Sequence, residues 1–328
     1  MAEMFPTRDG FGKEIVEIAK TNQKIVVVSA DLEDATRAEY FKKAYPERFF
    51  SVGIAEQDMV GVAAGLAFHG LVPFINSFAV FLTNRAYDMI RLDICYNDKN
   101  VKIICSHGGI TVGEDGASAQ CLEDFAIMRV LPNMKVVCPA DIIEAQKATR
   151  AFAVEKGPMY MRTGRAPMPV LTKESDTFEI GKANVMRDGR DVSIIACGVM
   201  VTEALSAAEM LKKDNIDARV VNMHTIKPID AKMIIKCAKE TGAIVSAEEH
   251  QINGGLGSAI AEVVVRQYPV PMEMVAVADS FGESGTPNQL MQAYHLKDVD
   301  IVAAVKKVLR ERSPLGEVLN PNEVRGSG

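Results

Sequence analysis

The sequence lacks the patterns that mark several large classes of protein. No block of lysine or arginine forms a basic stripe, and 43 acidic against 37 basic residues leave a formal charge of −6, which argues against nucleic acid as a partner. The six cysteines show no C-x-x-C spacing and no histidine at ligand spacing, so neither a zinc site nor a disulfide framework is predicted.

Targeting and nucleotide-binding patterns are also missing. The amino-terminal residues are charged where a signal peptide needs an apolar run, and the longest apolar stretch, residues 59–68, is too short to cross a bilayer. No Walker A motif, no G-x-S-x-G and no complete dinucleotide fingerprint occurs. We therefore expect a cytoplasmic protein that is neither exported nor inserted in a membrane.

What the sequence does contain is two series of strands that alternate with helices. Its 328 residues, 48% of them hydrophobic, suffice for two domains that need neither metals nor disulfides to fold. The apolar runs that predict strands are residues 24–30, 49–52, 71–75, 101–105, 135–138, 159–162, 192–197, 218–223, 243–247 and 273–278. The pattern predicts a doubly wound α/β domain followed by a smaller α/β domain.

These series set the expected boundaries. We expect the first domain over residues 1–170, a linker over 171–188 and the second domain over 189–312. Residues 313–328 lose hydrophobic periodicity and end in Arg-Gly-Ser-Gly, which is typical of a flexible tail or a cloning remnant.

Polar and aromatic residues follow several strands of the first domain, where a doubly wound sheet binds its ligands. Glu56 begins a helix whose following residues are small enough to predict deep packing, and local sequence favours a charge that complements the helix dipole over a buried acid with a raised pKa. The spacing of Phe78 and Phe81 favours core packing over stacking on a flat ligand.

Two further segments are candidates for ligand binding. Residues 107–120 combine four glycines, one histidine and two acids, a composition that favours a functional loop over a surface turn. Arg8, Arg162 and Arg165 lie beside turn-forming residues and suit either a phosphate or ordinary ion pairs. Sequence spacing alone cannot bring Arg8 and Arg165 together.

Six motifs resemble the carboxyl-terminal half of transketolase in order and spacing, over about residues 5–312. They are residues 29–32 (Ser-Ala-Asp-Leu), 52–57 (Val-Gly-Ile-Ala-Glu-Gln), 77–88 (Ser-Phe-Ala-Val-Phe-Leu-Thr-Asn-Arg-Ala-Tyr-Asp), 106–109 (Ser-His-Gly-Gly), 112–116 (Val-Gly-Glu-Asp-Gly) and 225–230 (Thr-Ile-Lys-Pro-Ile-Asp). The resemblance implies a thiamine-diphosphate pyrimidine-binding domain followed by the transketolase C-terminal domain.

The resemblance also implies a divided enzyme. The family binds its metal and diphosphate through a motif that begins Gly-Asp-Gly and ends near Asn-Asn, and neither string occurs in this chain. We therefore expect the C-terminal subunit of a split transketolase, active only with an N-terminal subunit that binds most of the thiamine diphosphate and the Mg²⁺, and self-associating into a heterotetramer. This subunit itself is expected to supply no metal ligand.

The implied reaction is transfer of a two-carbon ketol unit between sugar phosphates, from xylulose 5-phosphate to ribose 5-phosphate or erythrose 4-phosphate, in the pentose phosphate pathway. For the cofactor, the resemblance assigns Glu56 to the glutamate that hydrogen-bonds N1′ of the aminopyrimidine. It places Phe78 and Phe81 beside that ring. The other residues that it places around the pocket are Asp31, Ile54, Asn84 and Arg85.

For the substrate, the resemblance assigns His107 to a histidine that hydrogen-bonds the C1 hydroxyl of the donor, which makes Glu56 and His107 the catalytic pair. Asp115 would contact a sugar hydroxyl, Arg8 and Arg165 would hold the terminal phosphate, and Thr36 supplies the hydroxyl nearest to the family's phosphate-binding serine. Ala119 stands where many members carry a second substrate histidine or a glutamine, and a small loop shift could let Gln120 replace it.

Three alternatives stay open. The β subunit of a 2-oxo acid dehydrogenase has the same two-domain order but a substrate without phosphate. A deoxyxylulose-phosphate-synthase-like enzyme shares the glutamate and arginine motifs. A non-catalytic assembly subunit would explain Ala119.

Overall fold

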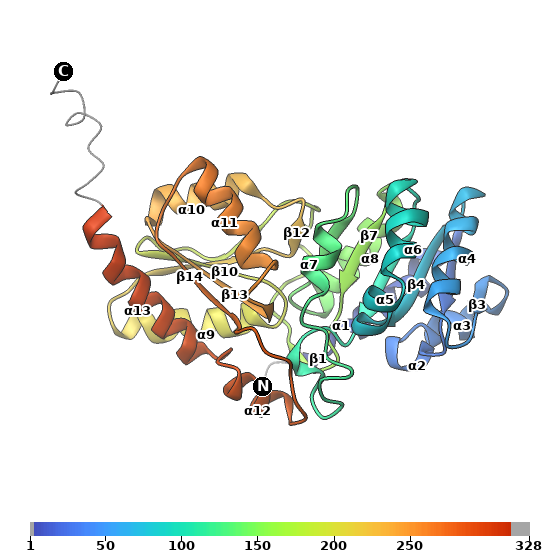
Figure 1. The fold of residues 1–328 in the computed structure, drawn as a ribbon, viewed down its shortest axis with the longest axis horizontal. Coiled ribbons are helices and arrows are strands. Elements are labelled where there is room, and N and C mark those ends of the chain that lie inside the picture. The colour runs from blue at the N-terminus through green and yellow to red at the C-terminus, as the bar shows by residue number, and fades with distance from the viewer. Residues whose placement is uncertain (1–2, 316–328) are drawn as a thin grey trace, which may run out of the picture.

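The first half of the chain forms a sheet in which six strands run parallel (Figure 1). In this computed structural model, which describes residues 3–315, the strand order is β12-β6-β7-β5-β4-β2-β3, where β12 (Thr225–Lys227) comes from the second half of the chain. The parallel strands are β2 (Ile25–Ser29), β3 (Phe49–Ser51), β4 (Val72–Phe78), β5 (Lys102–Ser106), β6 (Lys135–Val137) and β7 (Met159–Arg162).

Helices cover both faces of this sheet because its strands are apolar on both sides. Val27 and Phe74 face one apolar cluster, which contains residues of α1, α3 and α8, whereas Val28 and Ile75 face a second cluster with residues of α4, α5 and α7. The helices of this half are α1 (Thr7–Ala19), α2 (Glu33–Thr36), α3 (Glu39–Ala44), η1 (Pro46–Arg48), α4 (Glu56–Phe68), α5 (Ala79–Arg85), α6 (Tyr87–Met89), η2 (Ile90–Tyr96), η3 (Ile110–Val112), α7 (Asp124–Arg129) and α8 (Ile142–Val154).

The second half builds a five-stranded sheet in the order β14-β13-β10-β11-β9. Its strands are β9 (Asn184–Arg187), β10 (Val192–Ala196), β11 (Ala218–Asn222), β13 (Ile244–Gln251) and β14 (Met272–Val277). Its helices are α9 (Met200–Lys213), α10 (Ala231–Thr241), α11 (Leu256–Gln267), α12 (Pro287–Ala293) and α13 (Asp298–Leu315). Each of the ten predicted strands overlaps an observed one, although β4 and β13 extend past the predicted ends.

Four short strands were not predicted. β1 (Met4–Phe5) pairs with β8 (Met168–Pro169), and β9 begins the second sheet from within the expected linker 171–188. β12 (Thr225–Lys227) leaves the second half and pairs antiparallel with β6 at the edge of the first sheet. One continuous apolar cluster also joins the two halves through residues such as Phe125, Ile226 and Leu256, so the two units share a core.

The expectation for the carboxyl terminus needs one correction. Helix α13 continues through Leu315, so residues 313–315 of the expected tail are helical. The remaining part of that tail, residues 316–328, lies outside the described residues. No helix within residues 3–315 combines the length and the apolar character that crossing a membrane requires.

Helix α4 also departs from its prediction. Met59, Val60 and Ala63 are buried against the sheet. On the other face, a side chain added at Gly61 or Gly65 would meet no atom within 4 Å. The expectation of deep packing is therefore wrong for one face of this helix. Residues 54 and 68, an isoleucine and a phenylalanine, are 76% and 70% exposed, which leaves an apolar side chain exposed near each end of this helix.

Candidate active site

Glu56 lies at the first residue of α4 and is only 5% exposed. Its Oε1 accepts a hydrogen bond from Arg85 Nη1 at 3.0 Å. Among residues 3–315, Glu56 Oε2 has no hydrogen-bond partner, so one carboxylate oxygen remains available to a ligand. The carboxylate is thus buried and also located at a helix N-terminus, where the helix dipole favours negative charge.

Four side chains stack in a file beside this carboxylate. The Arg85 guanidinium lies 4.2 Å from the centre of the Phe81 ring, and the Phe81 and Phe78 rings lie 5.4 Å apart with planes inclined by 21°. The Phe78 ring in turn stacks on His107 at 3.7 Å and 20°. Both phenylalanines are only partly buried, so the core packing favoured by their spacing is wrong, and the rings connect Glu56 to His107.

His107 is held as a neutral ring. It is 2% exposed, has a left-handed backbone with φ of 61°, and its Nδ1 lies 2.8 Å from Ser106 Oγ. Burial, together with the charges of Arg8, Arg165 and Arg37, lowers its pKa to about 3. At neutral pH this side chain therefore offers a hydrogen bond without a charge.

The fold brings Arg8 and Arg165 together, which sequence spacing could not predict. Gly164 N donates to Thr7 Oγ1 at 2.6 Å and Arg8 N donates to Gly164 O at 3.4 Å, so the start of α1 is fastened beside the segment after β7. Burial and the neighbouring charge of Arg37, with a smaller contribution from Arg165, lower the pKa of Arg8. Three guanidinium groups thus share one electrostatic environment.

Each arginine of this cluster has its own anchor. Arg8 Nη1 donates to Ala35 O at 2.7 Å, and Arg37 Nε lies 2.8 Å from Asp9 Oδ1. Arg165 Nη1 donates to Val112 O at 2.7 Å and to Asp115 Oδ1 at 3.3 Å. Arg37 was not predicted as a site residue, and its position directly after Thr36 was the only sequence signal for it.

Other predicted residues lie at the rim. Asp31 and Ile54 are exposed and follow the adjacent parallel strands β2 and β3. Asn84 is also exposed and donates to Glu123 Oε1 at 2.8 Å. The Thr36 hydroxyl is buried and donates to Leu32 O at 2.8 Å, so its hydrogen is used within its own helical turn.

The substitution at position 119 is not compensated by its neighbour in this structure. Ala119 is buried, and the Gln120 side-chain amide donates to the carbonyls of Ile110 and Gly113 at 3.3 Å and of Glu283 at 2.9 Å. A loop shift that freed Gln120 for a substrate would break all three bonds.

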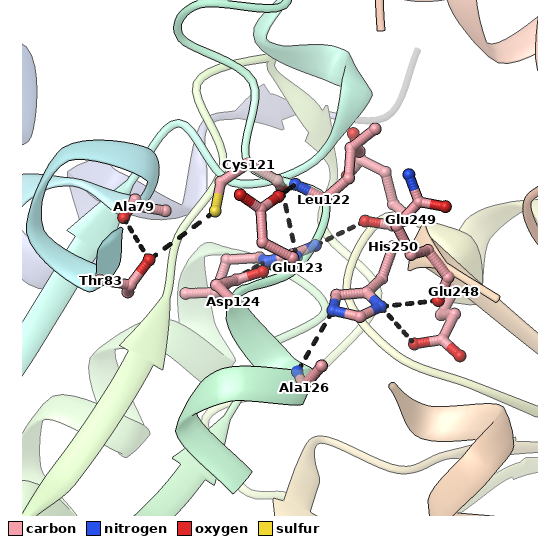
Figure 2. A network of polar contacts seen from close by, with 12 residues as sticks. Ala79, Thr83, Cys121, Leu122, Glu123, Asp124, Ala126, Glu248, Glu249 and His250 are labelled. Atoms are coloured by element: carbon pink, nitrogen blue, oxygen red, sulfur yellow. Dashed lines mark hydrogen bonds and ion pairs between the residues drawn. The ribbon is translucent and has the colours of Figure 1, made fainter. Parts of the chain in front are cut away.

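Arg162 does not belong to the arginine cluster. It is 4% exposed, and its Nε and Nη2 bond to the two carboxylate oxygens of Asp124, which is fully buried and also accepts from Tyr160 Oη at 2.5 Å. Figure 2 shows Asp124 together with Glu249 and His250 from the second half of the chain. Of the two interpretations left open for Arg162, a phosphate ligand or an ion pair, the structure supports the ion pair, because a buried carboxylate engages it.

A cleft of about 510 Å³ opens between the two halves at helix α5, the helix that also carries Phe81 and Arg85. Val80 and Asn84 of α5 line one side, the 117–123 segment lines the floor, and Gln251, Asp279 and Phe281 line the other side. Its volume is within the range of small-molecule sites. Paired rings, a carboxylate with one free oxygen and an adjoining cleft fit the aminopyrimidine half of thiamine diphosphate.

Potential metal ligands form no comparable cluster among the described residues. The described residues contain no group of three or more histidine, cysteine, aspartate or glutamate side chains arranged to hold a metal ion. The six cysteines are free and buried.

Comparison with known families identifies the two halves separately. The family described as "Transketolase, pyrimidine binding domain" matches residues 3–169, and the family described as "Transketolase, C-terminal domain" matches residues 181–301. The expected fold class and the order of the two domains are therefore confirmed.

Three relatives have nearly the same length as this chain. A Methanocaldococcus jannaschii protein named as a transketolase C-terminal section is 43% identical over 307 residues, which cover 93% of this chain and 96% of the relative. A 6-deoxy-6-sulfo-D-fructose transketolase subunit from Clostridium sp. is 40% identical over 93% of this chain and 95% of its own. A solved structure titled "Split gene transketolase, inactive beta4 tetramer" is 46% identical, with a TM-score of 0.87 over 94% of this chain and 99% of that one.

Proposed function

This chain belongs to the transketolase family, and from that premise we propose that it is the C-terminal subunit of a split transketolase that works with an N-terminal subunit. The observation that carries the proposal is the file of Arg85, Phe81, Phe78 and His107, which links Glu56 at one end to the arginine cluster at the other. One surface thereby combines a site for a flat heteroaromatic ring with a site for an anionic sugar.

Glu56, Phe78 and Phe81 would hold the aminopyrimidine of thiamine diphosphate, with Asp31, Ile54, Asn84 and Arg85 around it. Bound thiamine diphosphate supplies the cleavage and formation of the carbon–carbon bond. Glu56 Oε2 would accept a hydrogen bond from the ring or share its proton, and the buried setting of this carboxylate excludes competing water. Its Oε1 stays oriented by Arg85.

Arg8 and Arg165 would bind the terminal phosphate of the substrate, with Thr36 close to the same end. Guanidinium groups suit this task because they stay charged and present paired donors. Arg37 adds charge to the same cluster. His107 would donate to a substrate hydroxyl as a neutral ring, and Asp115, fixed by Arg165, would accept from another.

The proposed reaction is transfer of a two-carbon ketol unit from xylulose 5-phosphate to ribose 5-phosphate or erythrose 4-phosphate, in the pentose phosphate pathway of the cytoplasm. The name of the Clostridium relative points to a sugar with a sulfonate in place of the phosphate. An arginine cluster suits either anion, so the identity of the anionic end is open to direct test.

The N-terminal subunit is proposed to bind most of the thiamine diphosphate and the Mg²⁺. Open space at Gly61 and Gly65 and the exposed apolar residues near the two ends of α4 support a docking partner on this helix. The related inactive β4 tetramer supports two further points, self-association of this subunit and a lack of activity without the partner; with the N-terminal subunit the proposed assembly is a heterotetramer.

The test is a reconstitution. The purified chain is mixed with the N-terminal subunit from the same organism, thiamine diphosphate and Mg²⁺, and sedoheptulose 7-phosphate is measured from xylulose 5-phosphate and ribose 5-phosphate. Pyruvate is assayed in parallel, because a 2-oxo acid dehydrogenase subunit would favour it, and glyceraldehyde 3-phosphate with pyruvate tests the deoxyxylulose-phosphate alternative. A complex that turns over none of these pairs would favour the non-catalytic assembly subunit.

A further inference from the structure

The second domain holds the backbone of the loop 107–120 from beneath. Glu249, near the end of β13, accepts a hydrogen bond from Thr111 N through Oε1 and is 8% exposed. Gly109 has φ of +86°, and a side chain there would occupy the position of the Glu249 carboxylate. The carboxylate therefore fills the space that glycine leaves, two residues after His107.

The floor under this contact belongs to the first domain. A side chain at Gly108 would come within 2.6 Å of the Arg162 side chain. Arg162 Nη1 donates to the backbone carbonyl of Glu249 at 2.6 Å while its other nitrogens hold Asp124. Glu249 is thus held through both its backbone and its side chain, and Figure 2 includes Glu249, Asp124 and His250 in one network of polar contacts.

The far end of the loop 107–120 is also held by the second domain. Gln120 donates to Glu283 O at 2.9 Å, and a side chain at Gly116 would come within 2.5 Å of Ser284 Oγ. Asp115, which pairs with Arg165, lies between the Glu249 contact at Thr111 and this far end of the loop. The loop that carries two of the proposed substrate residues is therefore supported by the second domain at both ends.

We infer that Glu249 is a positioning residue for substrate recognition: its carboxylate fixes the Gly109–Thr111 turn and thereby sets where His107 and Asp115 stand. This inference rests on the proposed function for its kinetic consequence, although the loop contact itself belongs to the isolated chain. The Glu249 carboxylate bonds to Thr111 and faces the charge of Arg162, and neither residue is a proposed substrate ligand, so its effect on substrate passes through the loop.

Two variants separate this role from a general effect on folding. Glu249→Ala removes the acceptor of Thr111 N and leaves the left-handed turn unsupported, whereas Glu249→Gln keeps an acceptor oxygen and nearly the same volume. Glu262→Ala is the matched control, because Glu262 is a glutamate of the same domain that also pairs across the domain boundary, with Arg129 at 2.8 Å, but is 62% exposed.

In the reconstituted complex, Glu249→Ala should raise KM for ribose 5-phosphate about 10-fold or more with kcat changed less than about threefold, and Glu249→Gln should restore most of that loss. Glu262→Ala should match the wild type. Hydrogen exchange on the isolated chain should show faster exchange at Thr111 in Glu249→Ala, with protection of the β5 and β13 amides retained.

Unchanged KM in folded Glu249→Ala would overturn the inference. A fall in both kcat and melting temperature that Glu249→Gln fails to restore would also overturn it, since that result marks a purely structural residue. If the wild-type complex transfers no ketol unit, the proposed function fails. The hydrogen-exchange experiment on the isolated chain then tests the loop contact by itself, and unchanged protection of Thr111 in Glu249→Ala would overturn that contact.

Discussion

Replacing Asp124 by asparagine removes the negative charge that balances Arg162 beneath the loop 107–120. Asp124 is fully buried and Arg162 is 4% exposed, so water cannot take over the lost interaction. Asparagine preserves the shape and one acceptor oxygen for the hydroxyl of Tyr160. The variant therefore keeps the volume of the side chain but removes its charge and one of the two oxygens that accept hydrogen bonds.

The magnitude follows from burial. Removing one partner of a buried ion pair leaves an uncompensated charge and typically costs about 3–5 kcal/mol, against a total stability of roughly 5–15 kcal/mol for a folded protein. With a urea dependence of about 2–3 kcal/mol per molar, the unfolding midpoint should fall by roughly 1–2.5 M. Because the chain has no tryptophan, circular dichroism at 222 nm is the suitable signal.

Two companion variants sharpen this result. Glu17→Gln disrupts a pair with Lys20 in which both side chains are more than half exposed, and it should leave the unfolding midpoint nearly unchanged because water screens an exposed pair. Replacing both buried partners, Asp124→Leu with Arg162→Met, should recover part of the loss, since no unpaired charge is left.

The pH dependence has a defined sign. Burial raises the pKa of Asp124, but the charge and hydrogen bonds of Arg162 outweigh burial and hold it below the ordinary value. A carboxyl with a lowered folded pKa contributes stability above its unfolded pKa, near 4, and loses it as pH falls through the folded value. Asp124→Asn should lack this acid-sensitive contribution. A midpoint shift equivalent to less than about 1 kcal/mol would refute the reasoning.

Three other predictions concern separate parts of the chain. Lys102 is buried and donates to the carbonyls of Glu155 and Gly157 at 2.7 and 2.8 Å, and burial lowers its pKa to about 7. Because lysine in the unfolded chain titrates near 10.4, the unfolded state binds more protons between about pH 7 and pH 10, and stability should rise over that range. Lys102→Met should abolish the corresponding rise in melting temperature. Arg165→Ala should raise KM for phosphorylated acceptors about 10- to 100-fold in the reconstituted complex, whereas Arg190→Ala, whose side chain is 86% exposed, should not; equal effects would contradict the phosphate role. Gly61→Leu should fold normally, because its side-chain position is open, yet weaken assembly in sedimentation experiments; unaltered assembly would exclude this face of α4 as an interface.

Local pattern predicted the fold well because buried parallel strands are continuous apolar runs, and this signal needs no tertiary information. β12 escaped prediction because three residues between two longer elements carry no periodicity, and its partner β6 lies about 90 residues away. The expected packing of α4 failed for a different reason. Small residues let backbones approach each other, but sequence does not reveal whether the approaching surface belongs to the same chain.

The site residues also differ in whether local sequence or only the fold could reveal them. The loop 107–120 could be recognised from its composition alone. Arg8 and Arg165 could not be joined from spacing, because their proximity depends on Gly164 binding Thr7. Glu249 could not be singled out from the sequence, since a glutamate in the polar end of β13 gains a role only when the fold sets it under Gly109.

The central claim is that this chain supplies the catalytic glutamate of a two-subunit enzyme, and Glu56→Gln in the reconstituted complex tests it most directly. The measurement is the rate of ketol transfer from xylulose 5-phosphate to ribose 5-phosphate, with assembly followed by sedimentation. We expect a loss of about 100- to 10,000-fold with assembly intact. A Glu56→Gln complex that retains near wild-type turnover would contradict the account.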